Sequence, residues 1–318
     1  MSLLSRARDP LPSWHEGAAK EAIIGFVNRV TTSGHPEFIP IAERIAVFDH
    51  DGTLCPEMPV YAQFAFTADR ARAMAPAHPE WSGESPFKEV LAGDMIGALK
   101  LGIGVFARVL AATYAGMTTD EFERDVRTWM ATARHPKTGR PYTEMVYQPM
   151  LELIAFLQAN RFRVYLVSAS GIDFLRPWIE SVYSIPREQV IGSSIRLQFA
   201  SRDGKPALVR LPVLEVYDEG DEKPVAIHHF IGRRPVFAFG NADGDIAMLR
   251  WVASGDGPHF CGLLHHTDSD REWAYEAYDP ALPIGSAKKA LAMAPGEGWI
   301  VVDMKKDWRI IFSSGFRP

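Results

Sequence analysis

Residues 48–54 read FDHDGTL and begin at the last residue of the apolar run IAVF at residues 45–48. The apolar run is typical of a buried strand, and Gly52 permits a sharp turn where the strand ends. Asp49 and Asp51 therefore stand at a strand end, where a loop can turn both carboxylates toward one point. Open α/β sheets bind ligands at the carboxyl ends of their parallel strands. The pattern favours a catalytic pair, one nucleophile and one acid and base, over an ordinary polar turn.

A second strand is expected at residues 163–167, which lead into the small residues Ser168, Ala169, Ser170 and Gly171. Small side chains at a strand end leave backbone N–H groups and a hydroxyl free to hold a phosphate oxygen. A helix expected at about residues 172–182 would add its N-terminal dipole. The alternative is a plain strand-to-helix turn.

A third strand is expected at residues 235–239, followed by the acidic loop GNADGD at residues 240–245. A helical segment begins near Ile246. Carboxylate and amide oxygens at a strand end suit a hard cation. The alternative is an acidic turn that only caps the helix.

At these residues the chain resembles the haloacid dehalogenase-type phosphohydrolases, and within them the phosphoserine-phosphatase-like branch. The resemblance covers roughly residues 40–57 and 149–265. The D-x-D-G-T pattern at residues 49–53 is its most specific part, and the strand ending in Ser168 is its least specific. The family has four motifs in a fixed order, and Lys223 best fits the lysine of the third. The alternative is that Lys223 lies at the exposed start of a helix. The loop 240–245 fits the fourth motif, G-D-x-x-x-D, except that Asn241 stands where the family usually has aspartate.

The resemblance implies an α/β fold with a doubly wound parallel sheet, a Rossmann-like core. This core would comprise residues 1–57 and 149–318, with residues 58–148 inserted as an α-helical cap. Helical spacing of apolar residues in 97–115 and 118–133 supports the insert, and Thr118 offers an N-cap. The alternative is that these helices belong to the main body. Alternating residues between Ser193 and Glu222 predict a small β-hairpin that turns at Asp203-Gly204.

The resemblance also implies a mechanism. Asp49 would attack phosphorus to form an aspartyl-phosphate, and Asp51 would protonate the leaving oxygen and then deprotonate water. The first of these jobs requires a pKa of Asp51 above the usual aspartate value, which a neighbouring carboxylate and partial burial can produce. Ser168, with the backbone of Ala169 and Ser170, would hold the phosphoryl oxygens, and Lys223 would neutralise charge.

The implied cofactor is Mg²⁺. The resemblance places it on Asp49, the backbone carbonyl of Asp51 and the loop 240–245. Asn241 is the expected ligand from this loop, Asp243 is the competing one, and Asp245 is expected to orient water or Lys223.

Three further features are open to interpretation. Glu57 lies close to the position of a glutamate that binds the substrate ammonium in phosphoserine phosphatases, but it could also be an ordinary hinge charge. The pair His265-His266 follows a strand-like segment, and a rim or structural role is favoured over a metal site. The acidic loop 218–222 is expected to be a solvated surface.

Composition narrows the possible partners. A net charge of −5 without a basic run argues against nucleic-acid binding, and no apolar stretch is long enough to span a bilayer. Residues 1–15 lack an apolar signal core, which favours a cytoplasmic location unless a leader has been removed. The two cysteines, Cys55 and Cys261, make no disulfide framework, and Cys55 is interpreted as a packing residue.

The sequence therefore predicts a Mg²⁺-dependent phosphomonoesterase that acts on a small phosphorylated metabolite. A phosphotransferase of the same fold is one alternative. A catalytically weakened protein that binds phosphate esters is the other, and Asn241 is the residue that points to it. The identity of the substrate and the oligomeric state are not predicted.

Overall fold

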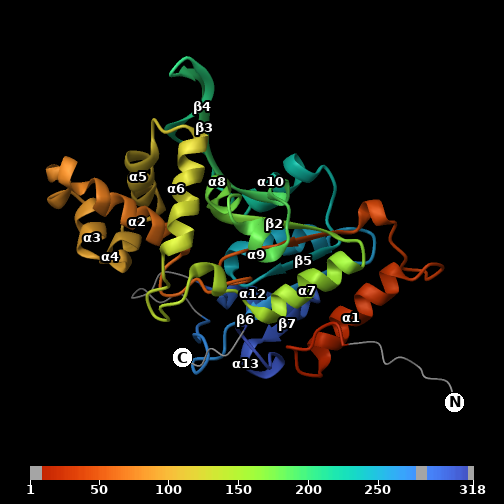
Figure 1. Ribbon diagram of the computed structural model, residues 1–318. Coiled ribbons are helices and arrows are strands. Elements are labelled where there is room, and N and C mark those ends of the chain that lie inside the picture. Colours follow the sequence, from red (N-terminus) through yellow and green to blue (C-terminus); the bar gives the residue numbers. More distant parts are fainter. Residues whose placement is uncertain (1–8, 277–284, 314–318) are drawn as a thin grey trace.

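The computed structural model describes residues 9–276 and 285–313, apart from the side chains of residues 103–107. Within this part of the chain, seven strands form one sheet in the order β4-β3-β2-β1-β5-β6-β7. All neighbouring strands are parallel except β3 and β4, which are antiparallel. The doubly wound α/β fold expected from the sequence is thus confirmed. The strands, shown in Figure 1, are β1 (Ile45–Phe48), β2 (Arg163–Gly171), β3 (Val190–Arg202), β4 (Lys205–Val216), β5 (Phe237–Gly240), β6 (Phe260–His265) and β7 (Ile300–Asp303).

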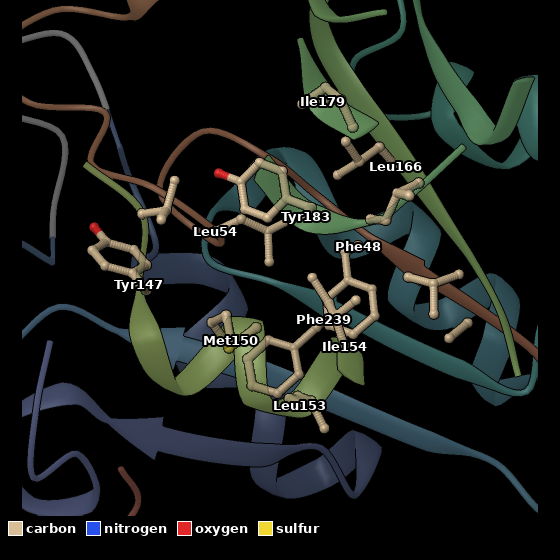
Figure 2. Packing of buried hydrophobic residues seen from close by; sticks show 14 of the residues in the cluster. Phe48, Leu54, Tyr147, Met150, Leu153, Ile154, Leu166, Ile179, Tyr183 and Phe239 are labelled. Atoms are coloured by element: carbon tan, nitrogen blue, oxygen red, sulfur yellow. The ribbon is translucent and has the colours of Figure 1, made fainter. Parts of the chain in front are cut away.

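Helices cover both faces of the sheet because successive strand residues point to opposite sides. Phe48 and Phe239 pack with Met150, Leu153 and Ile154 on one side, as Figure 2 shows. A separate cluster of buried side chains forms on the other side, around the middle residues of β1 and β5. Helices α1 (Ala18–Thr31) and α7 (Gln148–Ala159) cover the first side, and α10 (Glu222–Ile231), α11 (Ile246–Ala253) and α12 (Lys288–Glu297) cover the second.

The chain order places a topological switch between β1 and β5. From β1 the chain adds β2 and β3 on one side, and from β5 it adds β6 and β7 on the other. Loops after β1 and β5 therefore leave in opposite directions and open a crevice between them, which is the usual ligand position in such sheets.

Five helices between β1 and α7 lie in a group beside the β3–β4 hairpin (Figure 1). The Phe66 ring lies 5.4 Å from the Phe174 ring of the core, and Arg187 forms a 2.9 Å ion pair with Glu123. Backbone hydrogen bonds also join the Gly116–Met117 segment to Arg210 of β4. The group is therefore packed against both the core and the hairpin. It comprises α2 (Ala62–Met74), α3 (Phe87–Ala92), α4 (Met95–Lys100), α5 (Ile103–Tyr114) and α6 (Thr119–Thr132), and Thr118 caps α6 as expected.

Some elements differ from the expectation. The helix expected at residues 172–182 is interrupted into α8 (Ile172–Leu175) and α9 (Ile179–Tyr183), because Pro177 has no N–H to continue it. The hairpin is not separate from the sheet, since β3 first pairs with β2 and only then turns back. Its turn lies at Asp203 and Gly204, where both φ angles are positive as this turn requires.

The first eight residues of the polar stretch 1–15 lie outside the described part of the chain, so the structure adds nothing on them. Among the helices it does describe, none combines the length and the apolar character needed to cross a bilayer. The last helix, α13 (Met304–Asp307), follows β7 directly.

Candidate active site

The residues singled out after β1, β2 and β5 meet at one edge of the sheet. Most of them border a cavity of about 240 Å³, which lies at the switch between β1 and β5, but Asn241 and Asp243 are not among its lining residues. Because all these strands are parallel, their carboxyl ends face the same crevice. The cavity is lined by Asp49, Asp51, Glu57, Tyr61, Gln63, Phe64, Leu99, Ser168, Ala169, Ser170, Tyr217, Glu219, Lys223, Ala242, Gly244 and Asp245.

A buried lysine bridges two carboxylates in this cavity. Lys223 Nζ donates to Asp49 Oδ1 at 2.7 Å and to Asp245 Oδ1 at 2.6 Å. Burial lowers the pKa of Lys223, but attraction to Asp245 and Asp49 more than offsets this and holds the pKa well above its ordinary value. Lys223 is therefore a fixed positive charge beside Asp49, which excludes the alternative of an exposed helix start.

Asp245 is engaged as a structural anchor. Its Oδ2 accepts hydrogen bonds from the backbone N–H groups of Asn241 and Ala242 at 2.9 and 3.0 Å. Its other oxygen holds Lys223. Asp245 thus shapes the loop after β5 and orients Lys223, in the role expected for it.

Asp49 is nearly buried, and its carboxylate is strongly perturbed. Burial and repulsion from Asp245 raise the pKa of Asp49 to about 8, although Lys223 opposes the shift. Asp49 Oδ2 lies 3.3 Å from the hydroxyl of Thr53. One oxygen is therefore directed to Lys223, and the other to Thr53.

Asp51 is held in a different way from the one expected. Ser170 Oγ donates to Asp51 Oδ2 at 2.6 Å, and His50 Nδ1 lies 3.3 Å from Oδ1. Burial raises the pKa of Asp51, but His50 and the Ser170 hydrogen bond outweigh it, so the net pKa lies below the usual value. The expectation of a raised pKa is wrong for this arrangement, because the partners of Asp51 favour its charged form.

No sequence pattern singles out His50, which lies beside Asp51. It is buried against the rings of Trp178 and Tyr183, beside Asp51 and Cys55. The nitrogen, oxygen and sulfur atoms of His50, Asp51 and Cys55 lie within 4.8 Å of one another. Burial raises the pKa of the Cys55 thiol, consistent with a packing residue. These mixed donors do not suit Mg²⁺, which prefers oxygen ligands.

Asn241 lies between Thr53 and Glu57. Its Oδ1 accepts from Thr53 Oγ1 at 2.9 Å, and its Nδ2 donates to Glu57 Oε1 at 3.1 Å. The reverse orientation of the amide would set its oxygen against the Glu57 carboxylate, so this network fixes the orientation. Gly52 allows the close approach, since a Cβ there would lie 2.1 Å from Asn241 Nδ2.

Glu57 is buried behind Asn241 and has a second partner, Tyr275, whose hydroxyl donates to Oε1 at 2.5 Å. Burial, with repulsion from Asp49 and Asp51, raises the pKa of Glu57 well above its usual value despite the Tyr275 hydrogen bond. Glu57 also borders the cavity. It is not an exposed hinge charge, and Tyr275 could not be connected to it from sequence because 218 positions separate them.

Asp243 is not brought to the other candidate ligands in this structure. Its Oδ1 accepts from the backbone N–H groups of Lys289 and Ala290, both at 2.9 Å, and its Oδ2 accepts from Ser286 at 3.0 Å. Both oxygens are therefore committed to the start of α12. This capping role accounts for an aspartate at this position without a cation.

The expected phosphate cradle is present only in part. Ser168, Ala169 and Ser170 all line the cavity. However, the Ser170 N–H donates to Ser168 Oγ at 3.1 Å, and the Gly171 N–H donates to Gln63 Oε1 at 2.7 Å. The following helix, α8, has four residues and supplies little dipole. The helix-dipole part of the expectation is corrected, whereas the Ser168 hydroxyl hydrogen can still be donated to a ligand.

The loop after β6 contacts the loop that carries Asp49 and Asp51. His266 Nε2 lies 2.7 Å from the Gly52 carbonyl oxygen, and its Nδ1 lies 3.0 Å from Glu272 Oε2. Tyr147 donates to the other Glu272 oxygen at 2.8 Å. His266 is therefore placed to fix the Asp51–Gly52 turn, in line with a structural role.

The loop 218–222 is only partly the solvated surface expected for it, since Asp221 and Glu222 are exposed but its first residues are not. Asp218 is fully buried, and neither of its carboxylate oxygens has a hydrogen bond of normal geometry. Burial raises the pKa of Asp218 to about 7. Glu219 turns into the cavity near Lys223. The sequence shows only an acidic run and does not distinguish its buried first residues from its exposed last ones.

An all-oxygen set suitable for Mg²⁺ is present. Asp49 Oδ2 and Asn241 Oδ1 both lie within 3.3 Å of the Thr53 hydroxyl, so the two oxygens converge on one region. Asp51 belongs to the same loop and could add its backbone carbonyl. Carboxylate, amide and peptide oxygens are the ligands that Mg²⁺ takes in proteins, so the chemistry of this donor set fits the cation.

Comparison with known proteins agrees with the fold. The sequence profile of the family described as haloacid dehalogenase-like hydrolase matches residues 46–250. A search of curated proteins found no match. The structure is similar to that of a conserved functionally unknown protein from Anaerococcus prevotii DSM 20548, with a TM-score of 0.62 and 13% identity, covering 98% of this chain and 100% of that one.

It is also similar to a protein with unknown function from Bordetella pertussis Tohama I. That match has a TM-score of 0.53 and 14% identity, and it covers 82% of this chain and 99% of the other. A phosphoserine phosphohydrolase-like protein from Francisella tularensis subsp. tularensis SCHU S4 matches with a TM-score of 0.38 and 14% identity, over 70% of this chain and 87% of that one. At these identities, the first two likenesses concern the fold alone.

Proposed function

The chain belongs to the haloacid dehalogenase-like hydrolase family, and from this premise we propose that it is a Mg²⁺-dependent phosphomonoesterase that acts on a small phosphorylated metabolite. The observation that carries the proposal is the meeting of Asp49, Asp51 and Lys223 in one cavity, with Lys223 bonded directly to Asp49. A nucleophile, a proton carrier and a fixed positive charge are the groups that phosphoryl transfer to an aspartate requires.

In the first step, an oxygen of Asp49 bonds to phosphorus while the bond from phosphorus to the ester oxygen breaks. Asp51 gives its proton to the departing oxygen, which leaves as an alcohol. The pKa of Asp51 is lowered in the free protein, but the negative charge of a bound phosphate ester favours its protonated form. Ser170, which donates to Asp51, keeps that carboxyl oriented.

In the second step, Asp51 takes a proton from water, and the water oxygen attacks the phosphorus of the aspartyl-phosphate. The Asp49–phosphorus bond breaks, which returns the carboxylate and releases phosphate. Lys223 stays beside Asp49 and offsets the charge that builds on the phosphoryl oxygens. The Ser168 hydroxyl, which lines the cavity, supplies a further donor to those oxygens.

Mg²⁺ would be held by Asp49, the backbone carbonyl of Asp51 and the side-chain oxygen of Asn241, and when bound it would supply positive charge to the phosphoryl oxygens. Asp245 would act through Lys223 and the loop rather than as a ligand, because both of its oxygens have partners. Asp243 is left out for the same reason. Residues 58–148 would serve as the cap that covers the ester and excludes water.

The test is turnover of p-nitrophenyl phosphate with and without EDTA. Turnover that needs added Mg²⁺ supports the hydrolase. Tight binding of phosphate esters without turnover supports the second candidate, a weakened ester-binding protein, which Asn241 favours because its amide adds no charge to the cation site. Transfer of the phosphoryl group to an added alcohol, faster than to water, would identify a phosphotransferase.

A further inference from the structure

A second cavity of about 260 Å³ adjoins the catalytic one. Gln63, Phe64, Ala169 and Tyr217 line both cavities, so these residues form the shared boundary. Ala169 lies between the two serines that face the catalytic cavity. The second cavity therefore begins within one residue of the expected phosphate position.

This adjoining cavity is built mainly from apolar side chains of three separate parts of the chain. The cap helices, the β3–β4 hairpin and helix α8 each contribute a wall. The side chains that define it include Phe64, Leu110, Tyr114, Phe122, Phe174 and Leu214. It is unlike the catalytic cavity, which is bordered by five carboxylates and a single lysine. Two adjoining cavities of opposite character suit a ligand with a charged end and an apolar end.

Two of the three charged residues that line the adjoining cavity neutralise each other, and the third, Arg108 of α5, is at an exposed position. Asp173 and Arg210 form an ion pair with each other. The Arg210 guanidinium also lies over the Phe122 ring, 3.7 Å from its centre, and the Arg210 backbone is bonded to Gly116 and Met117. Arg210 is thereby committed to the wall of the cavity and does not offer an unpaired cation to a ligand.

Ser193, which also lines the adjoining cavity, has its hydroxyl engaged within the protein. Ser193 Oγ donates to the Ala169 carbonyl at 2.7 Å and accepts from the Asp218 N–H at 3.0 Å. A sugar or amino-acid moiety packed against the apolar side chains of this cavity would lose bonds to water, and each unsatisfied polar group costs free energy. A hydrocarbon moiety would lose nothing and gain from burial.

We propose that this cavity takes the leaving group of the substrate, so that the protein selects phosphate monoesters of apolar alcohols, aliphatic or aromatic, over sugar and amino-acid phosphates. The inference rests on the proposed phosphomonoesterase function, because it places the phosphate at Asp49. The ester oxygen then lies near Asp51, and the carbon chain runs past Phe64 and Tyr217 into the adjoining cavity. The two cavities together reach the volume of ordinary small-molecule sites, about 300–1,000 Å³.

The experiment measures binding and turnover separately. Binding is measured by calorimetry with n-alkylphosphonates, which cannot be hydrolysed, from methyl to octyl, in the presence of Mg²⁺. Each methylene that enters the cavity should tighten Kd about fourfold, until the cavity is full. Turnover is measured as kcat/KM on the matching n-alkyl phosphates, with glycerol phosphate and glucose 6-phosphate as polar comparisons, and it should show the same rise with chain length.

Variants test whether the gain comes from this cavity. Ala111→Phe fills it from α5, and the matched control is Ala112→Phe, which adds the same ring at the next, exposed position of that helix. Leu214→Trp fills it from β4, so that a folding defect in one variant does not decide the result. Each filling variant should keep methylphosphonate affinity and lose the dependence on chain length, whereas Ala112→Phe should keep both.

The outcomes separate the two proposals. Turnover of esters without any dependence on chain length, or a dependence that survives both filling variants, overturns the inference and leaves the phosphomonoesterase function standing. A dependence of Kd on chain length without turnover of any ester overturns the function and retains the apolar site. Failure to bind any phosphonate together with absence of turnover overturns both.

Discussion

The side-chain amide of Asn241 donates a 3.1 Å hydrogen bond to the carboxylate of Glu57. This contact accounts for how the site accommodates a neutral residue where the family usually has aspartate. The amide oxygen faces Thr53 and Asp49, and the Glu57 carboxyl group lies on the other side of the amide. Burial raises the pKa of Glu57 and favours its neutral form, so a cation bound at Asn241 Oδ1 would shift Glu57 toward its charged form.

The first prediction concerns the loop after β5. Asn241→Ala should weaken Mg²⁺ binding because it removes a ligand oxygen, and Asn241→Asp should bind Mg²⁺ at least as tightly as the native protein because it adds charge. The aspartate would stand against Glu57, so the metal-free variant should also be less stable. The double change Asn241→Asp with Glu57→Gln should restore stability. Calorimetric Mg²⁺ titration and thermal unfolding measure both effects.

The control for this prediction is Asp243→Ala. It should lower the free energy of unfolding by about 1 kcal/mol, because Asp243 caps α12, and leave the Mg²⁺ affinity unchanged. Loss of Mg²⁺ binding in Asp243→Ala, with no effect in Asn241→Ala, would show that the ligand has been assigned to the wrong residue of the loop.

The second prediction concerns the nucleophile. Asp49→Asn should abolish formation of the phosphoenzyme, because an amide does not attack phosphorus as a carboxylate does. Turnover should fall by several orders of magnitude, and mass spectrometry after acid quenching should find no added phosphate. Asp203→Asn, in the exposed hairpin turn, is the matched control and should be active. Near-native turnover in Asp49→Asn would contradict the assignment of Asp49 as the nucleophile.

The third prediction is a pH dependence of cation binding. Burial and Asp245 raise the pKa of Asp49 to about 8, and burial raises the pKa of Glu57. A cation favours the charged forms, so its binding should release protons, and its affinity should rise by up to about tenfold per pH unit for each proton released as the pH rises toward 8. Titrations in buffers of different ionisation enthalpy count the protons. Asp49→Asn should release fewer protons, and equal release in both proteins would contradict the prediction.

The parts of the sheet and the site that depend on neighbouring residues in the sequence could be predicted. Strand β1 and the Asp49–Asp51 pair follow from an apolar run that meets a glycine turn, and the contact of Lys223 with Asp49 agrees with the motif spacing. The partners that decide charge are distant in sequence. Tyr275 contacts Glu57 only because the fold brings them together. The same holds for the start of α12 and Asp243.

The pKa of Asp51 shows the same limit. A neighbouring carboxylate is visible in the sequence and suggests a raised pKa. The orientation of the adjacent His50, and the arrival of Ser170 from β2, depend on side-chain packing that the pattern does not encode. These two partners reverse the direction of the shift.

The fourth prediction separates the two roles of Asp51, as general acid in the first step and general base in the second. Asp51→Asn cannot give or take a proton, yet p-nitrophenolate leaves without one. With p-nitrophenyl phosphate this variant should therefore show a burst of about one p-nitrophenol per protein, followed by slow turnover, because hydrolysis of the aspartyl-phosphate still needs a base. With an alkyl phosphate it should show no burst. Equal bursts with both esters would mean that another group protonates the leaving oxygen.

The last prediction concerns Asp218, whose buried carboxylate has no hydrogen bond of normal geometry. Burial raises its pKa from 3.8 to about 7, so its contribution to folding stability is fully present below about pH 4 and is lost as the pH rises through 7. The loss is on the order of 4 kcal/mol for a shift of this size. Asp218→Asn removes the titrating charge, so the unfolding free energy of the variant minus that of the native protein should grow between pH 4 and pH 8. Urea unfolding at several pH values measures this difference, and Asp221→Asn, at an exposed position of the same loop, should show no such trend. A pH-independent difference for Asp218→Asn would mean that the carboxylate gains a partner, such as ordered water, which keeps it charged at little cost.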